Sequence, residues 1–137
     1  MAGIVGFGAA IVETAQLREA ELVRLKKLQT VFVQALSAQI SGITFNGSSN
    51  HRLPNNVHIT IDGIDNETLI MQLDEAGIMA ATGSACSASS DEPSHVLRVI
   101  GMTDAQARSS IRFTMGRNTT QKDIDYVLLV LTQLLNS

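Results

Sequence analysis

The sequence has a single cysteine and no tryptophan among its 137 residues. One cysteine cannot form an internal disulfide, so the chain is not a small secreted scaffold held by disulfides, and a reducing cytoplasm is the expected location. No apolar run approaches the roughly 20 residues that span a bilayer, and the first residues lack the basic flank of a secretion signal. We therefore expect no membrane association.

Basic residues are also few. Ten lysines and arginines stand against thirteen acidic residues, which gives a formal net charge of -3. Proteins that follow a nucleic-acid backbone carry a basic surplus, so this class is excluded. The only lysines are Lys26, Lys27 and Lys122. Hydrophobic residues make up 45% of the chain and charged residues 17%, which indicates one globular domain, residues 1–137, with a core of its own.

Four segments have the pattern of helices. Residues 8–39 place apolar side chains three and four positions apart, and Gly42 is a suitable stop signal after them. This apolar face comprises Leu17, Leu22, Leu25, Leu28, Phe32 and Leu36. Residues 65–77 form a second helix, which Asp65 or Asn66 can cap and Gly77 ends. Residues 93–100 form a brief helix with proline in its first turn. The last helix is capped by Thr119 or Thr120 and runs to about Leu135.

The remaining apolar segments indicate short strands. Residues 57–61 and 110–115 alternate apolar and polar side chains, the pattern of half-buried strands, and residues 43–45 and 78–81 are weaker candidates. The order of elements predicts an α/β (α+β) fold. We expect a two-layer sandwich in which three main helices cover one face of a small, mostly antiparallel sheet.

The cysteine, Cys86, lies in the stretch TGSACSASSDEPS, residues 82–94. A lone cysteine is commonly a small buried side chain. Here its neighbours are glycine, alanine, serine and threonine, followed at once by two acids, so burial would gain little to offset the ordering of the backbone. The composition favours an exposed, mobile loop, in which an accessible thiol is available for chemistry.

Two longer stretches resemble the C-terminal part of cysteine desulfurases, pyridoxal-phosphate enzymes of the class V aminotransferase type. They are ATGSACSASSDEPSHVLRVIG and ARSSIRFTMGRNTTQKDIDYVLLVL, and the opening GIVGFGAA resembles the entry to the same domain. The resemblance covers essentially the whole chain. Within the family it is to the group whose nucleophile lies on a longer, flexible loop.

This resemblance implies residue roles and partners. Cys86 would be the nucleophile that takes sulfur from L-cysteine as a persulfide, leaving L-alanine, and Arg112 would bind the substrate carboxylate, which suits its planar pair of donors. From the pattern alone, Arg112 is equally well an ordinary polar residue on the exposed side of a strand. The full-length enzyme would be a homodimer that uses pyridoxal phosphate and passes sulfur to an iron–sulfur scaffold or to a thiolation enzyme.

The chain lacks the motifs of the family's larger domain, which carries the Schiff-base lysine. Neither Lys26, Lys27 nor Lys122 matches that residue, so we expect no bound cofactor and no desulfurase activity from this chain alone. The primary interpretation is the separated C-terminal domain of a desulfurase, with Met1 an introduced or alternative start. Two alternatives remain open, a stand-alone sulfur carrier that receives persulfide on Cys86 and a domain of a relative such as a selenocysteine lyase.

Other motifs favour ordinary structural roles. His95 is expected to be solvated at the start of a helix, and His51 and His58 make a poor metal site and are expected on the surface and on a strand face. We expect Arg98, Arg108 and Arg117 to be at the surface or structural. The glycines of GIVGFG indicate helix entry and close packing rather than a phosphate cradle, since no strand precedes them.

Overall fold

The computed structural model describes residues 1–82 and 94–136. Along the chain the elements are α1 (Ala2–Gln39), β1 (Ile43–Phe45), β2 (Asn56–Ile61), α2 (Asn66–Glu75), α3 (His95–Val99), α4 (Asp104–Arg108), β3 (Ser110–Thr114) and α5 (Gln121–Leu135). Within the described residues, no helix combines the length and the apolar character needed to cross a membrane.

The three strands form one antiparallel sheet in the order β1-β2-β3. β2 is central, and its Ile59 lies opposite Phe45 of β1 and Ile111 of β3. Because side chains alternate along a strand, Val57, Ile59 and Ile61 share one face of β2, and His58 and Thr60 occupy the other. The prediction of a small, mostly antiparallel sheet is confirmed.

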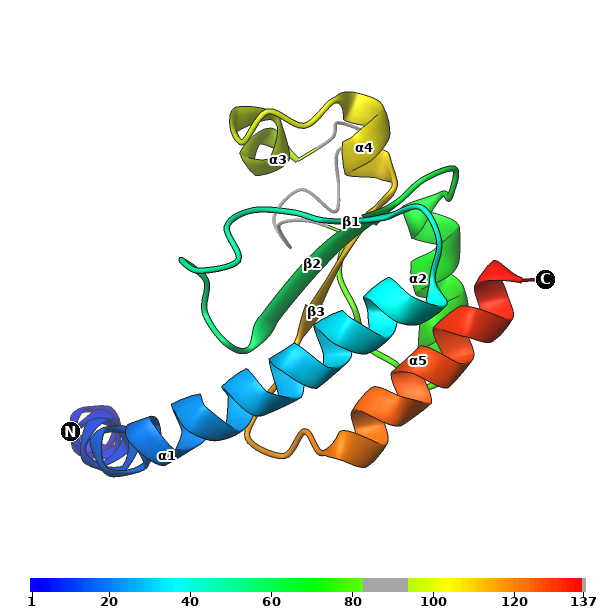
Figure 1. Cartoon of the computed structure of the whole chain (residues 1–137). Coiled ribbons are helices and arrows are strands. Elements are labelled where there is room, and N and C mark those ends of the chain that lie inside the picture. The colour runs from blue at the N-terminus through cyan, green and yellow to red at the C-terminus, as the bar shows by residue number, and fades with distance from the viewer. Residues whose placement is uncertain (83–93, 137) are drawn as a thin grey trace.

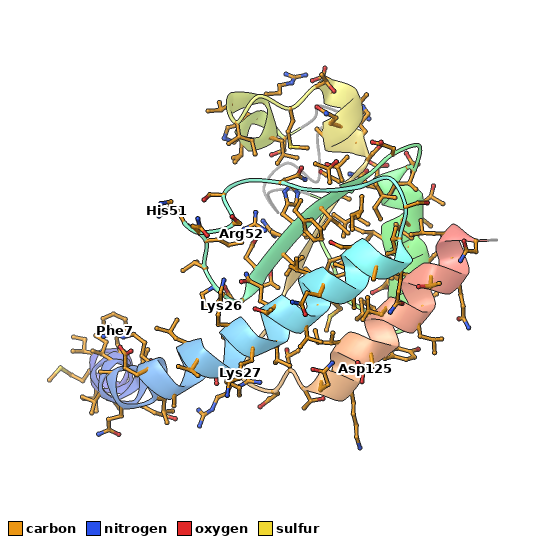
Figure 2. The ribbon with its side chains drawn as sticks, viewed as in Figure 1. Phe7, Lys26, Lys27, His51, Arg52 and Asp125 are labelled. Carbon is orange, nitrogen blue, oxygen red and sulfur yellow. The ribbon has the colours of Figure 1, made fainter. Side chains whose placement is uncertain are left out.

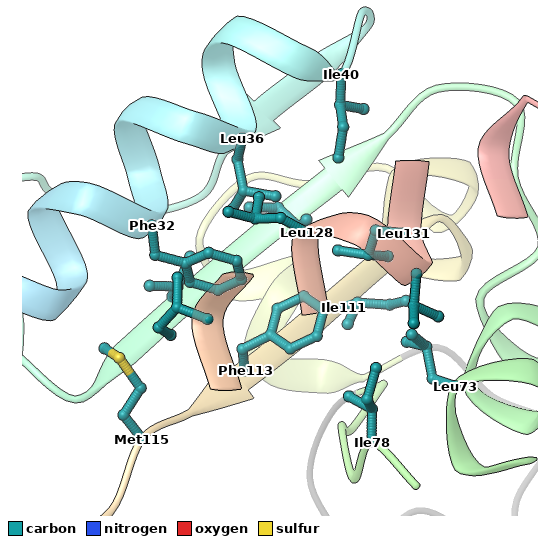
Figure 3. Packing of buried hydrophobic residues seen from close by; sticks show 14 of the residues in the cluster. Phe32, Leu36, Ile40, Leu73, Ile78, Ile111, Phe113, Met115, Leu128 and Leu131 are labelled. Carbon is teal, nitrogen blue, oxygen red and sulfur yellow. The ribbon is translucent and has the colours of Figure 1, made fainter. Parts of the chain in front are cut away.

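Helices α1, α2 and α5 cover the apolar face, as the sequence predicts (Figure 1). Phe32 of α1 and Phe113 of β3 meet edge to face at the centre of this layer, with ring centroids 5.5 Å apart and an interplanar angle of 81°. Leu36, Leu73, Ile111 and Leu131 are completely buried around them (Figure 3). The core therefore joins all three helices to the central strands.

α1 has two unequal parts. Its second part packs on the sheet through Leu25, Leu28, Phe32 and Leu36, but its first part extends beyond the rest of the molecule (Figure 1). The expectation of one buried face from residue 17 onward is wrong at its start, because Leu17 and Leu22 are each 39% exposed. The expected close packing at the first glycines is also wrong, since a Cβ at Gly3, Gly6 or Gly8 would meet nothing within 4 Å.

Local capping explains most helix ends. Asp65 accepts a hydrogen bond from the Thr68 amide at 2.8 Å, and Thr120 forms a capping box with Asp123. A second capping box, Thr103 with Gln106, starts α4, which the sequence analysis missed. Gly42, the proposed stop after α1, has a φ of +69° that favours glycine.

One expected strand, residues 78–81, is not formed. The amide of Ile78 donates to the Leu73 carbonyl at 2.8 Å, so this residue still belongs to the closing turn of α2. Met79 is 89% exposed. Only Ala81 pairs with the sheet, through an isolated antiparallel bridge to Arg112.

Candidate functional site

The candidate site lies on the polar face of the central strand pair. His58 of β2 and Arg112 of β3 are directly opposite in the register, so their side chains are neighbours on the face away from α1, α2 and α5. On its other edge, Arg112 pairs with Ala81, donating its amide to the Ala81 carbonyl at 2.7 Å and accepting from the Ala81 amide at 3.1 Å. The backbone of Arg112 is therefore fixed on both sides.

A cavity of about 240 Å³ opens over this face. α3 covers it with Val96, Leu97 and Ile100, and Ser94 precedes them. The loop between β1 and β2 adds Asn46, Gly47 and Arg52, and the strands add Asn56, His58 and Arg112. Two guanidinium groups and one imidazole line the cavity, and none of these lining residues is an acid.

The Arg112 side chain is half-buried, and among residues 1–82 and 94–136 its guanidinium has no ion pair or hydrogen-bond acceptor. Other arginines in the same described part do have acidic partners. Arg24 pairs with Glu21 at 2.7 Å, and Arg117 pairs with Glu13 at 3.0 Å. Withdrawing a guanidinium partly from water without a carboxylate partner is unfavourable, so the cavity favours an anionic ligand.

His58 is 9% exposed, and it is held neutral. Burial, which is the largest cause, and the positive charges of Arg52 and Arg112 together lower the pKa of its imidazole from 6.5 to about 4. A neutral imidazole can accept as well as donate a hydrogen bond. At neutral pH the cavity therefore carries two positive charges, both from arginine.

The loop that carries His51 and Arg52, both labelled in Figure 2, is bonded to α1. The buried Gln29 donates to the carbonyls of Leu53 and Asn56, at 3.2 Å and 2.8 Å. At Gly47 the φ is +82°, and a Cβ there would lie only 3.0 Å from Nη2 of Arg52. Glycine at this position thus allows both the turn and the approach of the guanidinium.

The base of the loop is also held to β2. The amide of Asn46 donates to the His58 carbonyl at 2.9 Å. The Asn46 side chain exchanges hydrogen bonds with the Thr60 hydroxyl at 2.9 Å and 3.1 Å, in a buried position. These bonds satisfy the polar groups beneath the cavity and leave the two arginines facing into it.

The structure places the predicted residues as follows. Arg112 lines the cavity, whereas Cys86 lies outside the described residues, in the segment 83–93. The two ends of this segment are near Arg112, because Ala81 pairs with it and Ser94 lines the same cavity. His95 is exposed at the start of α3, as expected.

The remaining sequence predictions concern surface residues. His51 is exposed, and Arg98, Arg108 and Arg117 are exposed too, with Arg98 bonded to Asp104 at 2.7 Å. His58 lies on a strand face as expected, but it is buried in the cavity wall. Within the described residues, no group of three potential ligands gathers to hold a metal.

Arg52 is the site residue that sequence reasoning missed. It lies in an irregular loop, where no periodicity indicates which way a side chain points. The sequence offered one clue to Arg52, which is its position. It stands two residues before Pro54, in a segment that leads directly into the clearest strand pattern of the chain.

Comparisons with known proteins agree with this fold. The model of the aminotransferase class-V family matches residues 1–127. The chain is 40% identical over 135 residues to the cysteine desulfurase IscS of Dictyoglomus turgidum and 41% identical over 136 residues to that of Clostridium botulinum. Each alignment covers 98% of this chain and 34% of the relative, so the chain spans about a third of the length of these proteins.

Solved structures show the same relation. A NifS-like protein from Rickettsia africae superposes with a TM-score of 0.85 at 25% identity, covering 98% of this chain and 34% of the other. A second NifS-like protein, at 23% identity, shares the fold with a TM-score of 0.82. The fold thus defines an α/β domain of the kind found in aminotransferases. The chain belongs to the aminotransferase class-V family.

Proposed function

We propose that this chain is the C-terminal domain of a cysteine desulfurase, with Arg112 binding the substrate carboxylate and Cys86 accepting the sulfur. The observation that carries the proposal is the position of Arg112. It lines a partly buried cavity, next to both ends of the segment that contains Cys86, and none of the lining residues in the described part of the chain is an acid. The similarity to cysteine desulfurases over 98% of the chain supports the substrate.

Arg112 suits the carboxylate of an amino acid. A guanidinium stays charged at any working pH and offers two parallel N–H donors to the two carboxylate oxygens. The strand position fixes its backbone from both sides, through His58 and Ala81.

In this proposal, Cys86 reaches a substrate that is held by Arg112. It follows Ala81 by five residues, and a chain of that length spans at most about 17 Å. In the proposed reaction the Cys86 thiolate attacks the sulfur of L-cysteine. A sulfur–sulfur bond forms, the carbon–sulfur bond breaks, and a proton goes to the former thiol-bearing carbon. Cysteine thiol plus L-cysteine gives persulfide plus L-alanine, so atoms and electrons balance without an external oxidant.

The residues present do not fit pyridoxal phosphate as a resident cofactor. Such enzymes hold the cofactor through a lysine, and Lys26, Lys27 and Lys122 are all exposed on helices and do not line the cavity. Lys26 instead donates to the side chain of Gln29 at 3.0 Å. In this proposal the cofactor and its lysine belong to a larger domain, and residues 1–137 form the smaller one.

The same proposal extends to partners and location. A persulfide on Cys86 is passed to a sulfur-acceptor protein, either an iron–sulfur scaffold or a thiolation enzyme, and the complete enzyme is a homodimer in the cytoplasm. A reducing compartment suits this chemistry because it keeps the single thiol free.

The carboxylate role is tested by ligand binding. We expect L-cysteine to shift the backbone amide resonances of β3 and α3, and cysteamine, which lacks only the carboxylate, to bind much more weakly. Arg112→Gln should weaken L-cysteine binding by about tenfold or more, because it removes a charged, two-pronged hydrogen bond, and should leave cysteamine unchanged. The affinity of Arg112→Lys for L-cysteine should lie between those of the unaltered chain and of Arg112→Gln.

The control is Arg18→Gln, which removes the same charge from an exposed site on α1 that pairs only with Glu19 among the described residues. It should bind L-cysteine as the unaltered chain does. Equal binding of L-cysteine and cysteamine, or an Arg112→Gln protein that binds L-cysteine normally, contradicts the proposal.

A further inference from the structure

We propose that Arg52 is a second anion-binding residue of this cavity, so that the site takes a small ligand with two negative groups, one on Arg112 and one on Arg52. This inference rests on the proposed function for the role of Arg112, and it adds the substrate class. For an amino-acid substrate, the second group is an ionised side chain, such as a thiolate.

The charges of the cavity support this. Arg52 and Arg112 line the same 240 Å³ space, and the His58 between them on β2 carries no charge at neutral pH. Among residues 1–82 and 94–136, none of the lining residues is acidic, although the whole chain has an acidic surplus. Burial lowers the pKa of the Arg52 guanidinium, which shows that this group is partly withdrawn from water. One carboxylate neutralises only one of the two positive charges.

The position of Arg52 is built into the fold. Gln29 holds the loop at two carbonyls, that of Leu53, one residue after Arg52, and that of Asn56, four residues after Arg52. Gly47 leaves room for the guanidinium by having no Cβ. A long side chain on an unrestrained loop would turn to solvent to recover its hydration, whereas here the hydrogen bonds keep the loop over the cavity.

The remaining polar groups complement two anions. The neutral imidazole of His58 donates one N–H, and the hydroxyl of Ser94 and the amide of Asn56 are further potential donors on the wall. Val96, Leu97 and Ile100 of α3 supply an apolar side, which suits a short carbon chain between the charged groups.

The test compares succinate, with two carboxylates, and butyrate, with one carboxylate on a chain of the same length. Binding to the complete 137-residue chain is measured by amide chemical shifts at low ionic strength, with Arg52→Gln, Arg112→Gln and Arg18→Gln as variants. We expect the unaltered chain to prefer succinate. Arg52→Gln should weaken succinate binding by about tenfold and change butyrate binding by less than twofold.

Arg112→Gln should weaken both ligands, and Arg18→Gln should weaken neither. A fourth variant, Gln29→Ala, should reduce the preference for succinate without removing any charge, because it releases the loop that holds Arg52. Equal affinities for the two ligands in the unaltered chain, or equal losses for both in Arg52→Gln, overturn the inference. Such a result leaves the L-cysteine and cysteamine comparison at Arg112 intact, so the two proposals fail separately.

Discussion

At the scale of single residues, His58 shows how the cavity is tuned. Its imidazole lies on the strand face between two arginines, nearly removed from water. Protonation there would add a third positive charge to a partly buried space, which is why its pKa falls to about 4.

This shift predicts how stability depends on pH. In the unfolded chain the imidazole binds a proton below about pH 6.5, but in the folded chain it does so only below about pH 4. The free energy of unfolding should therefore fall as the pH drops through this window, because the unfolded state takes up a proton that the folded state excludes. The loss amounts to about 3 kcal/mol at most, and urea unfolding at a series of pH values measures it.

His58→Asn provides the control, because asparagine keeps a polar group on the strand but does not titrate. Between pH 6.5 and pH 4 its free energy of unfolding should fall much less than that of the unaltered chain. The pKa values of the capping acids Asp65 and Asp123 are lowered, so their effect comes at lower pH and is common to both proteins. Parallel curves for the two proteins in this window contradict a neutral, buried His58.

Sequence reasoning could place some of these residues but not all. The alternation of β3 put Arg112 on the face opposite Ile111 and Phe113, which was correct. The same alternation did not show whether this face meets solvent or a ligand, because periodicity does not show what covers a sheet. Arg52 depends on Gln29, a residue of another element with carbonyl partners 24 and 27 positions away, and no local pattern encodes such a contact.

At the scale of elements, α1 is one continuous helix with two different environments. Beyond Leu25 its side chains form the core, and before it they are largely exposed, including Phe7 at 70% (Figure 2). Arg24 lies where the two parts meet. It donates to the carbonyls of Thr119 and Gly116 at 2.6 Å and 2.9 Å, and so bonds the helix to the segment between β3 and α5. The first part thus contributes little to the packed interior.

Two substitutions of the same type within this helix test the difference. Phe32→Ala should lower the free energy of unfolding by about 3–5 kcal/mol, because it removes a buried ring that packs edge to face on Phe113. Phe7→Ala should change it by less than about 0.5 kcal/mol, because that ring is exposed. Urea denaturation of both variants gives the comparison, and a Phe7→Ala loss similar to that of Phe32→Ala contradicts the described packing.

The elements themselves were largely predictable, since their signals are local. Capping residues, glycine stops and apolar periodicity place β1, β2, β3 and α5 within about a residue of their observed bounds and α2 within two residues, whereas α1 begins at Ala2 and not near residue 8 as expected. The helix α4 was missed because it is a single short turn, although its Thr103 and Gln106 form a recognisable capping box. The expected strand at 78–81 failed because its first residue completes the end of α2.

At the scale of the whole molecule, the described residues form a layered α/β domain with a cation-lined cavity, and the chain has an acidic net charge. Its relatives are about three times as long. The exposed apolar residues at the start of α1, such as Ile4, Val5 and Phe7, are those that gain nothing from the packing of this domain. In the proposed reaction, this chain would supply an anion site and a thiol, and the cofactor would come from a larger domain.

The most direct test of this account is the reactivity of Cys86 in the native chain. The intact protein is treated with a low-molecular-weight persulfide donor, first folded and then in denaturant, and the mass of the chain is measured with Cys86→Ser as the control. A sulfur-accepting thiol should gain one sulfur atom in the folded chain about as readily as in the unfolded chain, and the serine variant should gain none. A folded chain that stays unmodified and reacts only after unfolding would show a buried, structural cysteine and would contradict the proposed role.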